Sequence, residues 1–522
     1  MPYLGLTGTG LVAAITISSG MGFVMFGFDN GLMGSILTAD GFIDTFHLSS
    51  SMEGLITAIF QLGALLGALA TTFLGSRFGR RTLAHLGTGI LCAGAVLQAS
   101  SFSPAQLGVG RVVAGVGLGL VAGNVAIWQS ETAPSRYRGT LVGCSLSFLI
   151  IGQLIAYWME YGISGYSGDF PWRFPMAFQS VLAILLSTLL AVMPESPRYL
   201  VMKGRVEEAT QVFQALRPNE PAEEIAQEVA DINQAILLEQ HAQKGLRQLF
   251  FEKDQIRSRY RLALACGLNF MQDFSGSTPI SYYTTYIFQT SVGMSRHLSL
   301  LMSGLLQVWF LIASMGTWYL IEKFGRRNCF MYTAGGMTVI MVLLAVMLEI
   351  DTKGTGIAAV VLIFAYQTVY TWGFMAGVWT YGPEILPLEY RSVGVGLANS
   401  TLWVFGFAVT MFVPPAITNI GWRIYIIFAA FNLSYVPIVY FFFPETSGLS
   451  LEMIDLAFMD RTKGPVKCAA ELRRMVKSGQ HVTLTQEISE KMTVAEEHEP
   501  GTLRWRMQPS KEVADKSTRT HA

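Results

Sequence analysis

Charged residues are scarce in this sequence. Asp, Glu, Lys and Arg make up 14% of its 522 residues, against about 25% in a typical soluble domain. The segments 201–261 and 446–522 hold 42 of the 72 charged residues, which leaves the remaining chain too poor in charge for a water-facing surface. This distribution excludes a soluble enzyme, a disordered regulator and a collagen-like fibre. Because acidic and basic residues both number 36, no nucleic-acid partner held by bulk charge is expected.

Metal-ligating and catalytic patterns are missing as well. The five cysteines form no CxxC pair, and the seven histidines form no HxxxH or HExxH pattern. These absences exclude a zinc site, a disulfide framework and a metalloenzyme. A P-loop of the GxxxxGKS or GxxxxGKT type is also absent, which excludes this route of coupling to ATP. We therefore expect no enzyme activity, no metal and no cofactor.

Long apolar runs take the place of the missing charge. Runs of about 20 residues cross a bilayer core of about 30 Å as helices, and they are too continuous for barrel strands. The first charged residue is Asp29, so we expect no cleavable signal peptide and interpret residues 11–28 as the start of a retained span. The twelve predicted spans are residues 11–37, 54–76, 82–103, 104–128, 139–159, 174–194, 262–289, 298–321, 328–349, 354–382, 392–415 and 424–443.

The predicted fold class is an all-α membrane protein whose twelve helices form two six-helix bundles. We assign the first bundle to residues 1–200 and the second to 262–445, with a cytoplasmic helical linker at 201–261 and a cytoplasmic, largely disordered tail at 446–522. The linker contains an amphipathic helical pattern, with apolar residues spaced at Ile225, Val229, Ile232 and Ile236.

Orientation follows from basic residues in the short loops. The loops after the second, fourth and eighth spans each contain two or three basic residues, whereas the loops on the other side are acidic or nearly uncharged. The positive-inside rule then places both termini and the linker in the cytoplasm.

The two halves of the sequence repeat each other. Arg77-Phe-Gly-Arg-Arg81 matches Lys323-Phe-Gly-Arg-Arg327, and the Glu131/Arg138 spacing of seven recurs at Glu384/Arg391. Such a duplication predicts a secondary transporter, in which two halves rock about a substrate site near the bilayer midplane.

Charged residues at the cytoplasmic helix ends are predicted to form gating ion pairs between the halves, which hold an outward-open state. The alternative is simple anchoring of arginines at the membrane surface, which does not account for the repeated glutamates. The predicted gate residues are Arg80, Arg81, Glu131, Arg138, Glu195, Arg326, Arg327, Glu384, Arg391 and Glu445.

These motifs resemble those of the sugar porter family of the major facilitator superfamily, in particular fungal sugar and polyol transporters. The resemblance covers about residues 20–455. It rests on the repeated loop motif, on Glu131-Thr-Ala-Pro-Ser-Arg-Tyr-Arg-Gly139, on Pro194-Glu-Ser-Pro-Arg198 and on Pro444-Glu-Thr-Ser-Gly448. It implies the major facilitator fold, a multi-pass protein of the plasma membrane, and a monomer as a sufficient unit.

Ionisable residues inside a span are costly and mark functional candidates. Asp29 and Arg111 lie at similar depth, which suggests a buried pair whose carboxylate takes up a proton. The resemblance matches them to the proton-coupling residues of symporters; a purely structural pair is the alternative. Asp273 lies near the middle of the seventh span, where it could contact substrate or bind a proton.

Candidate substrate residues come from the same resemblance. They combine amides, hydroxyls and aromatic rings that suit a sugar: Gln153, Gln272, Asp273, Thr278, Tyr282, Tyr283, Trp379 and Trp403. Thr278, Phe310, Leu402 and Gly406 replace polar residues common in the family, so the site has fewer amides than a glucose carrier.

The predicted function is secondary transport of a sugar or similar polyhydroxylated solute, with proton symport. The expected partners are that solute, H⁺ and the lipid bilayer. One alternative is a facilitative carrier of a polyol, a quinate-type acid or a less polar metabolite. The other is a transport-inactive nutrient sensor.

Overall fold

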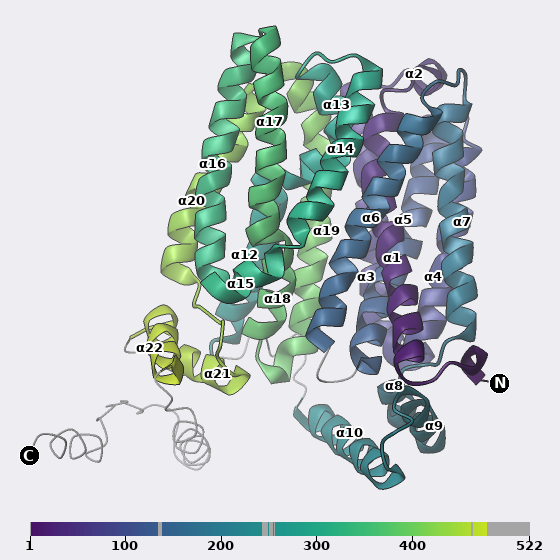
Figure 1. Ribbon diagram of the computed structural model, residues 1–522, viewed down its shortest axis with the longest axis vertical. Helices are drawn as coiled ribbons and strands as arrows, with labels where there is room; N and C mark the ends of the chain where they lie inside the picture. Colours follow the sequence, from purple (N-terminus) through teal and green to yellow (C-terminus); the bar gives the residue numbers. More distant parts are fainter. Residues whose placement is uncertain are drawn as a thin grey trace, which may run out of the picture.

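The computed structural model describes residues 2–133, 138–242, 249, 254, 256–460 and 463–477. Two bundles of long helices stand side by side, with short helices below them (Figure 1). The bundle formed by residues 1–200, called the first half, contains α1 (Gly8–Ile36), α3 (Ser50–Phe78), α4 (Arg80–Ala99), α5 (Pro104–Thr132), α6 (Arg138–Ile163) and α7 (Phe170–Val192).

The bundle formed by residues 258–442, called the second half, is more interrupted. Its elements are α12 (Ser258–Gln272), η2 (Asp273–Ser277), α13 (Thr278–Thr290), α14 (Arg296–Ser314), α15 (Thr317–Phe324), α16 (Arg326–Ile350), α17 (Lys353–Tyr370), η3 (Thr371–Met375), α18 (Ala376–Ile385), η4 (Leu388–Tyr390), α19 (Arg391–Ile420) and α20 (Arg423–Phe442). Within the described residues, ten helical stretches are long and apolar enough to cross a membrane. The other two predicted spans correspond to α6 and to the broken helix α12–η2–α13.

The outer surface of the bundles is apolar. Phe73, Tyr332 and Phe441 expose 70%, 68% and 68% of their surface, which suits contact with lipid chains. Inside a bundle, small residues let helix backbones approach closely. A Cβ atom on Gly67 of α3 would lie 2.2 Å from the carbonyl oxygen of Val116 on α5, so this contact requires glycine.

Two predicted spans are broken by π-helical turns rather than continuous. The first break is η2, where Gly276 has φ +103°, and the second is η3. Irregular backbone at membrane depth is tolerated only where protein or a cavity surrounds it. Both breaks therefore mark the interior of the second half.

The linker is helical, as predicted. It contains α8 (Pro197–Met202), α9 (Val206–Leu216) and α10 (Ala222–Ala242). Ile225 and Val229 of the predicted amphipathic pattern are buried, and these helices lie below the first half (Figure 1).

The tail begins with structure that the sequence did not predict. Helices α21 (Leu451–Met459) and α22 (Pro465–Lys477) pack together through Met453, Cys468 and Leu472. Asp455 forms an ion pair of 2.6 Å with Arg261 at the start of α12. Burial raises the pKa of the Asp455 carboxyl, and Arg261 opposes that rise. The prediction of a largely disordered tail did not include these two helices, and residues 461–462 and 478–522 lie outside the described residues.

The remaining short elements lie at the two membrane faces. They are η1 (Pro2–Gly5) before the first span and α2 (Asp40–Phe46) in the loop that follows it.

Candidate functional site

A cavity of about 100 Å³ lies between the two halves and is called the central cavity. Seven of the eight predicted substrate residues line it; Tyr283 does not. The lining residues are Phe26, Asn30, Gln61, Leu149, Gln153, Gln272, Asp273, Ser277, Thr278, Ser281, Tyr282, Phe310, Tyr370, Met375, Trp379, Leu402, Trp403 and Gly406.

The polar part of the cavity contains hydrogen-bond acceptors without partners. Thr278 Oγ1 donates to Asp273 Oδ1 at 2.9 Å, and Gln272 Nε2 donates to Tyr370 Oη at 3.0 Å. Asp273 Oδ2, Gln153 Oε1 and Gln272 Oε1 have no hydrogen-bond partner within the described chain. Buried acceptors of this kind favour a ligand that brings donors, as a hydroxylated molecule does.

The apolar part of the cavity is aromatic. The Trp403 ring lies 5.2 Å from the Phe26 ring, and Trp379 also lines the cavity. Phe310 and Leu402, which replace polar residues of the resembled family, line it too. The cavity is therefore less polar than the family pattern alone implies.

Asn30, Gln61 and Tyr370 line the cavity but were not predicted from the sequence. Asn30 and Gln61 are amides inside otherwise apolar spans, and that anomaly is a signal that could have identified them. Tyr370 carries no such signal, because tyrosine is common in membrane helices and in their packed interiors.

No lysine, arginine or histidine is among the described residues that line the central cavity. Asp273 is the one carboxyl group in this lining. A negatively charged ligand would therefore meet a carboxyl group and no cation, which is unfavourable in a low-dielectric interior.

Asp29 of α1 and Arg111 of α5 form a buried ion pair, as the sequence predicts. Arg111 Nη1 lies 2.5 Å from Asp29 Oδ1, and Arg111 Nη2 lies 3.5 Å from Asp29 Oδ2. Arg111 is 0% exposed and Asp29 is 2% exposed. Such a pair is held in the membrane only because each charge offsets the other.

The ion pair also holds α3. Arg111 donates to the carbonyl oxygens of Ile56 and Thr57 at 3.4 Å and 3.1 Å, and its guanidinium lies 4.4 Å from the Phe60 ring centre. One arginine thus connects α1, α3 and α5. Release of Asp29 would loosen this three-helix contact.

Helix α3 in turn packs against the second half. Gln61 Nε2 donates to Thr410 Oγ1 of α19 at 3.0 Å, and Tyr283 Oη of α13 donates to the Thr410 carbonyl oxygen at 2.8 Å. Tyr283 thus lies outside the lining of the central cavity and connects α13 to α19 within the second half, at the residue that Gln61 of the first half contacts.

The outer ends of the halves are in contact in this structure. Tyr157 Oη donates to the Ser281 carbonyl oxygen at 3.0 Å, and the hydroxyls of Ser35 and Thr285 lie 3.0 Å apart. A Cβ atom on Gly34 would lie 2.5 Å from the Tyr282 carbonyl oxygen. These contacts close the route from the central cavity to the outer face.

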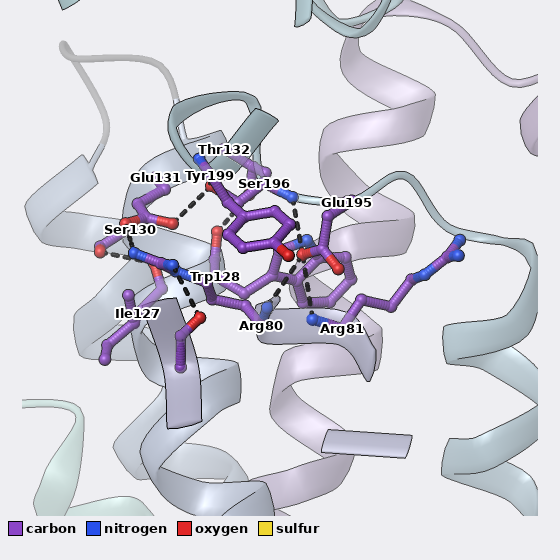
Figure 2. Close-up of polar contacts among 11 residues, drawn as sticks. Arg80, Arg81, Ile127, Trp128, Ser130, Glu131, Thr132, Glu195, Ser196 and Tyr199 are labelled. Atoms are coloured by element: carbon purple, nitrogen blue, oxygen red, sulfur yellow. Dashed lines mark hydrogen bonds and ion pairs between the residues drawn. The ribbon is translucent and has the colours of Figure 1, made fainter. Parts of the chain in front are cut away.

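At the end of the first half that is predicted to face the cytoplasm, the predicted gate residues form one cluster (Figure 2). Arg80 Nη2 pairs with Glu131 Oε1 at 3.0 Å, and Ser196 Oγ donates to Glu131 Oε2. The backbone N–H groups of Arg80 and Arg81 donate to Glu195 Oε1 at 3.1 Å and 3.0 Å. Glu195 thus caps the N-terminus of α4, where a negative charge is favourable.

The second half repeats this cluster. Arg326 Nη2 pairs with Glu384 Oε1 at 3.0 Å, and the Arg326 backbone N–H donates to Glu445 Oε1 at 2.9 Å. Arg327 and Arg391 donate to the carbonyl oxygens of Tyr440 and Leu386. The motif duplication read from the sequence therefore reappears as duplicated geometry.

The predicted ion pairs between the halves stay a prediction, because they belong to an outward-open state and the outer ends are in contact here. Among the described residues, the ion pairs of both clusters join residues of the same half and do not bridge the halves. The side chain of Arg138 lies outside the described residues. Glu131 and Glu384 pair with an arginine of their own half, whereas Glu195 and Glu445 accept backbone N–H groups at the start of α4 and α16. Glu445 also lies 3.6 Å from Arg473 of α22.

Comparisons with known proteins agree with this geometry. Residues 13–458 match the model of the family described as "Sugar (and other) transporter". The sugar transporter STL1 of Saccharomyces cerevisiae is 34% identical over 469 residues, which cover 87% of this chain and 82% of that protein. A high-affinity glucose transporter of Kluyveromyces lactis is 30% identical over 464 residues, covering 84% and 83%.

Among solved structures, the xylose transporter XylE of E. coli in a partially occluded inward-open conformation matches with a TM-score of 0.72. It is 22% identical, and the match covers 85% of this chain and 100% of XylE. XylE bound to 6-bromo-6-deoxy-D-glucose, described as a proton:xylose symporter, matches with a TM-score of 0.71 at 23% identity, covering 85% and 98%. At this level of sequence identity the structural similarity is evidence for the fold alone, and it confirms the predicted all-α class.

Proposed function

The chain belongs to the family of sugar (and other) transporters of the major facilitator superfamily, and from this premise we propose that it carries a neutral polyhydroxylated solute together with a proton. Its family consists of transporters and not enzymes. The proposed cycle alternates between outer-closed and inner-closed arrangements of the two halves.

The substrate class follows from the central cavity and from the relatives. Unpartnered acceptors on Gln153, Gln272 and Asp273 can receive hydroxyl donors, and Trp379 and Trp403 offer apolar faces to a sugar ring. The relatives are called a sugar transporter and a glucose transporter. The absence of a cation from the described lining favours a sugar or polyol over a quinate-type acid.

One observation carries the coupling proposal: the Asp29–Arg111 pair, buried and joined at 2.5 Å. A proton that binds Asp29 removes its negative charge and releases Arg111. Arg111 also donates hydrogen bonds to the carbonyl oxygens of Ile56 and Thr57. A movement of the released Arg111 side chain therefore changes its contacts with α3. Helix α3 contacts α19 through Gln61 and Thr410, so protonation changes the contact between the halves.

The cytoplasmic clusters keep each half rigid while the halves rock. Arg80–Glu131 and Arg326–Glu384 tie helix ends within one half. We place both termini in the cytoplasm and the protein in the plasma membrane, because the basic loops surround these clusters. Epitope tags at each terminus, probed in intact and permeabilised cells, test this orientation.

The decisive experiment measures uptake into proteoliposomes with and without an inward proton gradient, over a panel of sugars, polyols and sugar acids. We expect accumulation of a neutral solute against its gradient when the outside is acidic. Asp29→Asn should abolish accumulation and keep exchange of solute at equal concentrations, because exchange needs no net proton movement. Asp44→Asn, which changes an exposed outer carboxyl, is the matched control.

The other outcomes separate the alternatives. Uptake that does not depend on the proton gradient and is unchanged in Asp29→Asn would identify a facilitative carrier. Binding of the solute without exchange would identify a transport-inactive sensor. Uptake restricted to sugar acids would contradict the substrate class.

A further inference from the structure

A second carboxyl group is buried between the two halves, and the proposed proton coupling does not use it. Glu160 lies one turn from the outer end of α6 and is 4% exposed. Within the described chain, neither of its carboxyl oxygens has a hydrogen-bond partner. An ionised carboxylate without a partner is costly in such a site, so this environment favours the protonated form.

Residues next to Glu160 on α6 contact the second half. Its neighbour Trp158 packs where Gly304 of α14 leaves room, since a Cβ atom there would lie 3.2 Å from the indole. The Tyr161 ring lies 5.1 Å from the ring of His297, also on α14. The contacts on either side of Glu160 in the sequence therefore exist only while the outer ends of the halves meet.

The charged and titratable groups around Glu160 are few. Arg296, the first residue of α14, exerts its charge on the carboxyl, but the described structure contains no ion pair between them. Tyr157 lies one turn earlier on α6 and uses its hydroxyl on the Ser281 carbonyl oxygen. His297 stacks on Tyr161. On the side of α1, the carboxyl lies beside the hydroxyl of Ser35.

The hydrogen-bond directions among the hydroxyls of Ser303, Thr285 and Ser35 show whether Ser35 can donate to Glu160 or accept from it. Ser303 Oγ donates to the Ser299 carbonyl oxygen at 2.7 Å, and Thr285 Oγ1 donates to Ser303 Oγ at 3.0 Å. The Thr285 proton is thus used, so Ser35 must be the donor in the 3.0 Å contact between Ser35 and Thr285. The open end of the chain at Ser35 is then an acceptor, which suits a protonated carboxyl group and not a carboxylate.

We propose that Glu160 is a second proton-binding site, which holds a proton while the outer ends of the halves are closed and exchanges it with the outside when they separate. The site is separate from Asp29, whose carboxylate is paired with Arg111 of α5. By linkage, a proton bound more tightly in the closed arrangement stabilises that arrangement. Acid outside the membrane therefore closes the outer face, and neutral pH opens it.

The test is a distance measurement across the outer face, made by double electron–electron resonance spectroscopy on the full chain in lipid nanodiscs. Spin labels at Asp44→Cys on α2 and Lys353→Cys on α17, both exposed, report the separation of the halves after replacement of the native cysteines. We expect a short distance at acidic pH and a growing population of a longer distance at neutral pH. Glu160→Gln should keep the short distance at both pH values.

Three further variants make the result specific. Asp29→Asn should retain the pH response, so a failure of the Asp29 coupling scheme is seen in uptake and not in this distance. Ser35→Ala should move the transition to lower pH, because it removes the hydroxyl beside the carboxyl that can accept from its protonated form. Asp40→Asn, an exposed outer carboxyl, should change nothing. A distance without pH response in the parent chain, or a full response in Glu160→Gln, would overturn the proposal.

Discussion

Asp29 and Arg111 show how one buried pair can serve both stability and switching. Each charge alone is costly to bury, and the pair persists because a 2.5 Å contact and two backbone carbonyl oxygens satisfy the guanidinium. Removing one partner of a buried pair costs about 3–5 kcal/mol, mostly because the other charge is left unpaired. Protonation of Asp29 removes the same interaction reversibly, and this makes the pair suitable for coupling.

At this scale we predict that Arg111→Gln lowers the melting temperature in detergent strongly, by the equivalent of about 3–5 kcal/mol. The double variant Asp29→Asn with Arg111→Gln should recover part of the loss, because no unpaired charge remains. Thermal unfolding of the two variants and of Asp29→Asn alone provides the comparison. A double variant that is as unstable as the sum of the single variants would contradict a direct pair.

At the scale of the element, the seventh span shows how a membrane helix can be interrupted at a useful point. The π-helical turn η2 places Asp273, Ser277 and the following Thr278 in the lining of the central cavity. Gly276 makes the turn possible with φ +103°. Asn432 Nδ2 and Tyr366 Oη both donate to the Ser275 carbonyl oxygen, at 2.7 Å and 2.9 Å. The neighbouring helices thus satisfy the backbone that the turn leaves unpaired.

We predict that Gly276→Ala destabilises the protein by at least about 1 kcal/mol, because alanine is strained at this φ. The added Cβ atom would also lie 2.5 Å from Cε of Met341. Gly267→Ala in α12 is the matched control, since nothing lies within 4 Å of its Cβ position. Melting temperatures and solute affinity should fall for Gly276→Ala and stay unchanged or rise for Gly267→Ala. Equal behaviour of the two variants would contradict the role of the turn.

At the scale of the whole molecule, the halves meet at one end, and each half is held by its own cluster of charged residues at the other end. The hydroxyls of Ser35 and Thr285 lie 3.0 Å apart across the halves. The hydroxyls of Thr285 and Ser303 lie 3.0 Å apart within the second half. These two equal distances offer a direct test of rocking, because only the first must change during transport.

We predict that a disulfide between Ser35→Cys and Thr285→Cys, in a chain without native cysteines, blocks transport and that a reductant restores it. The matched pair Thr285→Cys with Ser303→Cys should form a disulfide and leave transport active. Uptake before and after reduction, with gel-shift detection of free thiols, measures both. Full transport in the oxidised Ser35–Thr285 variant would contradict rocking about the outer contact.

The sequence by itself determined the spans, the duplication and the Asp29–Arg111 pair, because lipid imposes length, polarity and charge rules on each segment locally. It also identified seven residues of the central cavity through a family pattern. Only the tertiary structure decided that Asn30, Gln61 and Tyr370 join them, because contacts between distant helices select which polar groups face the same space. The same holds for the partners of the gate residues and for Glu160, whose burial depends on the packing of helices distant in the sequence and is not encoded in α6 alone.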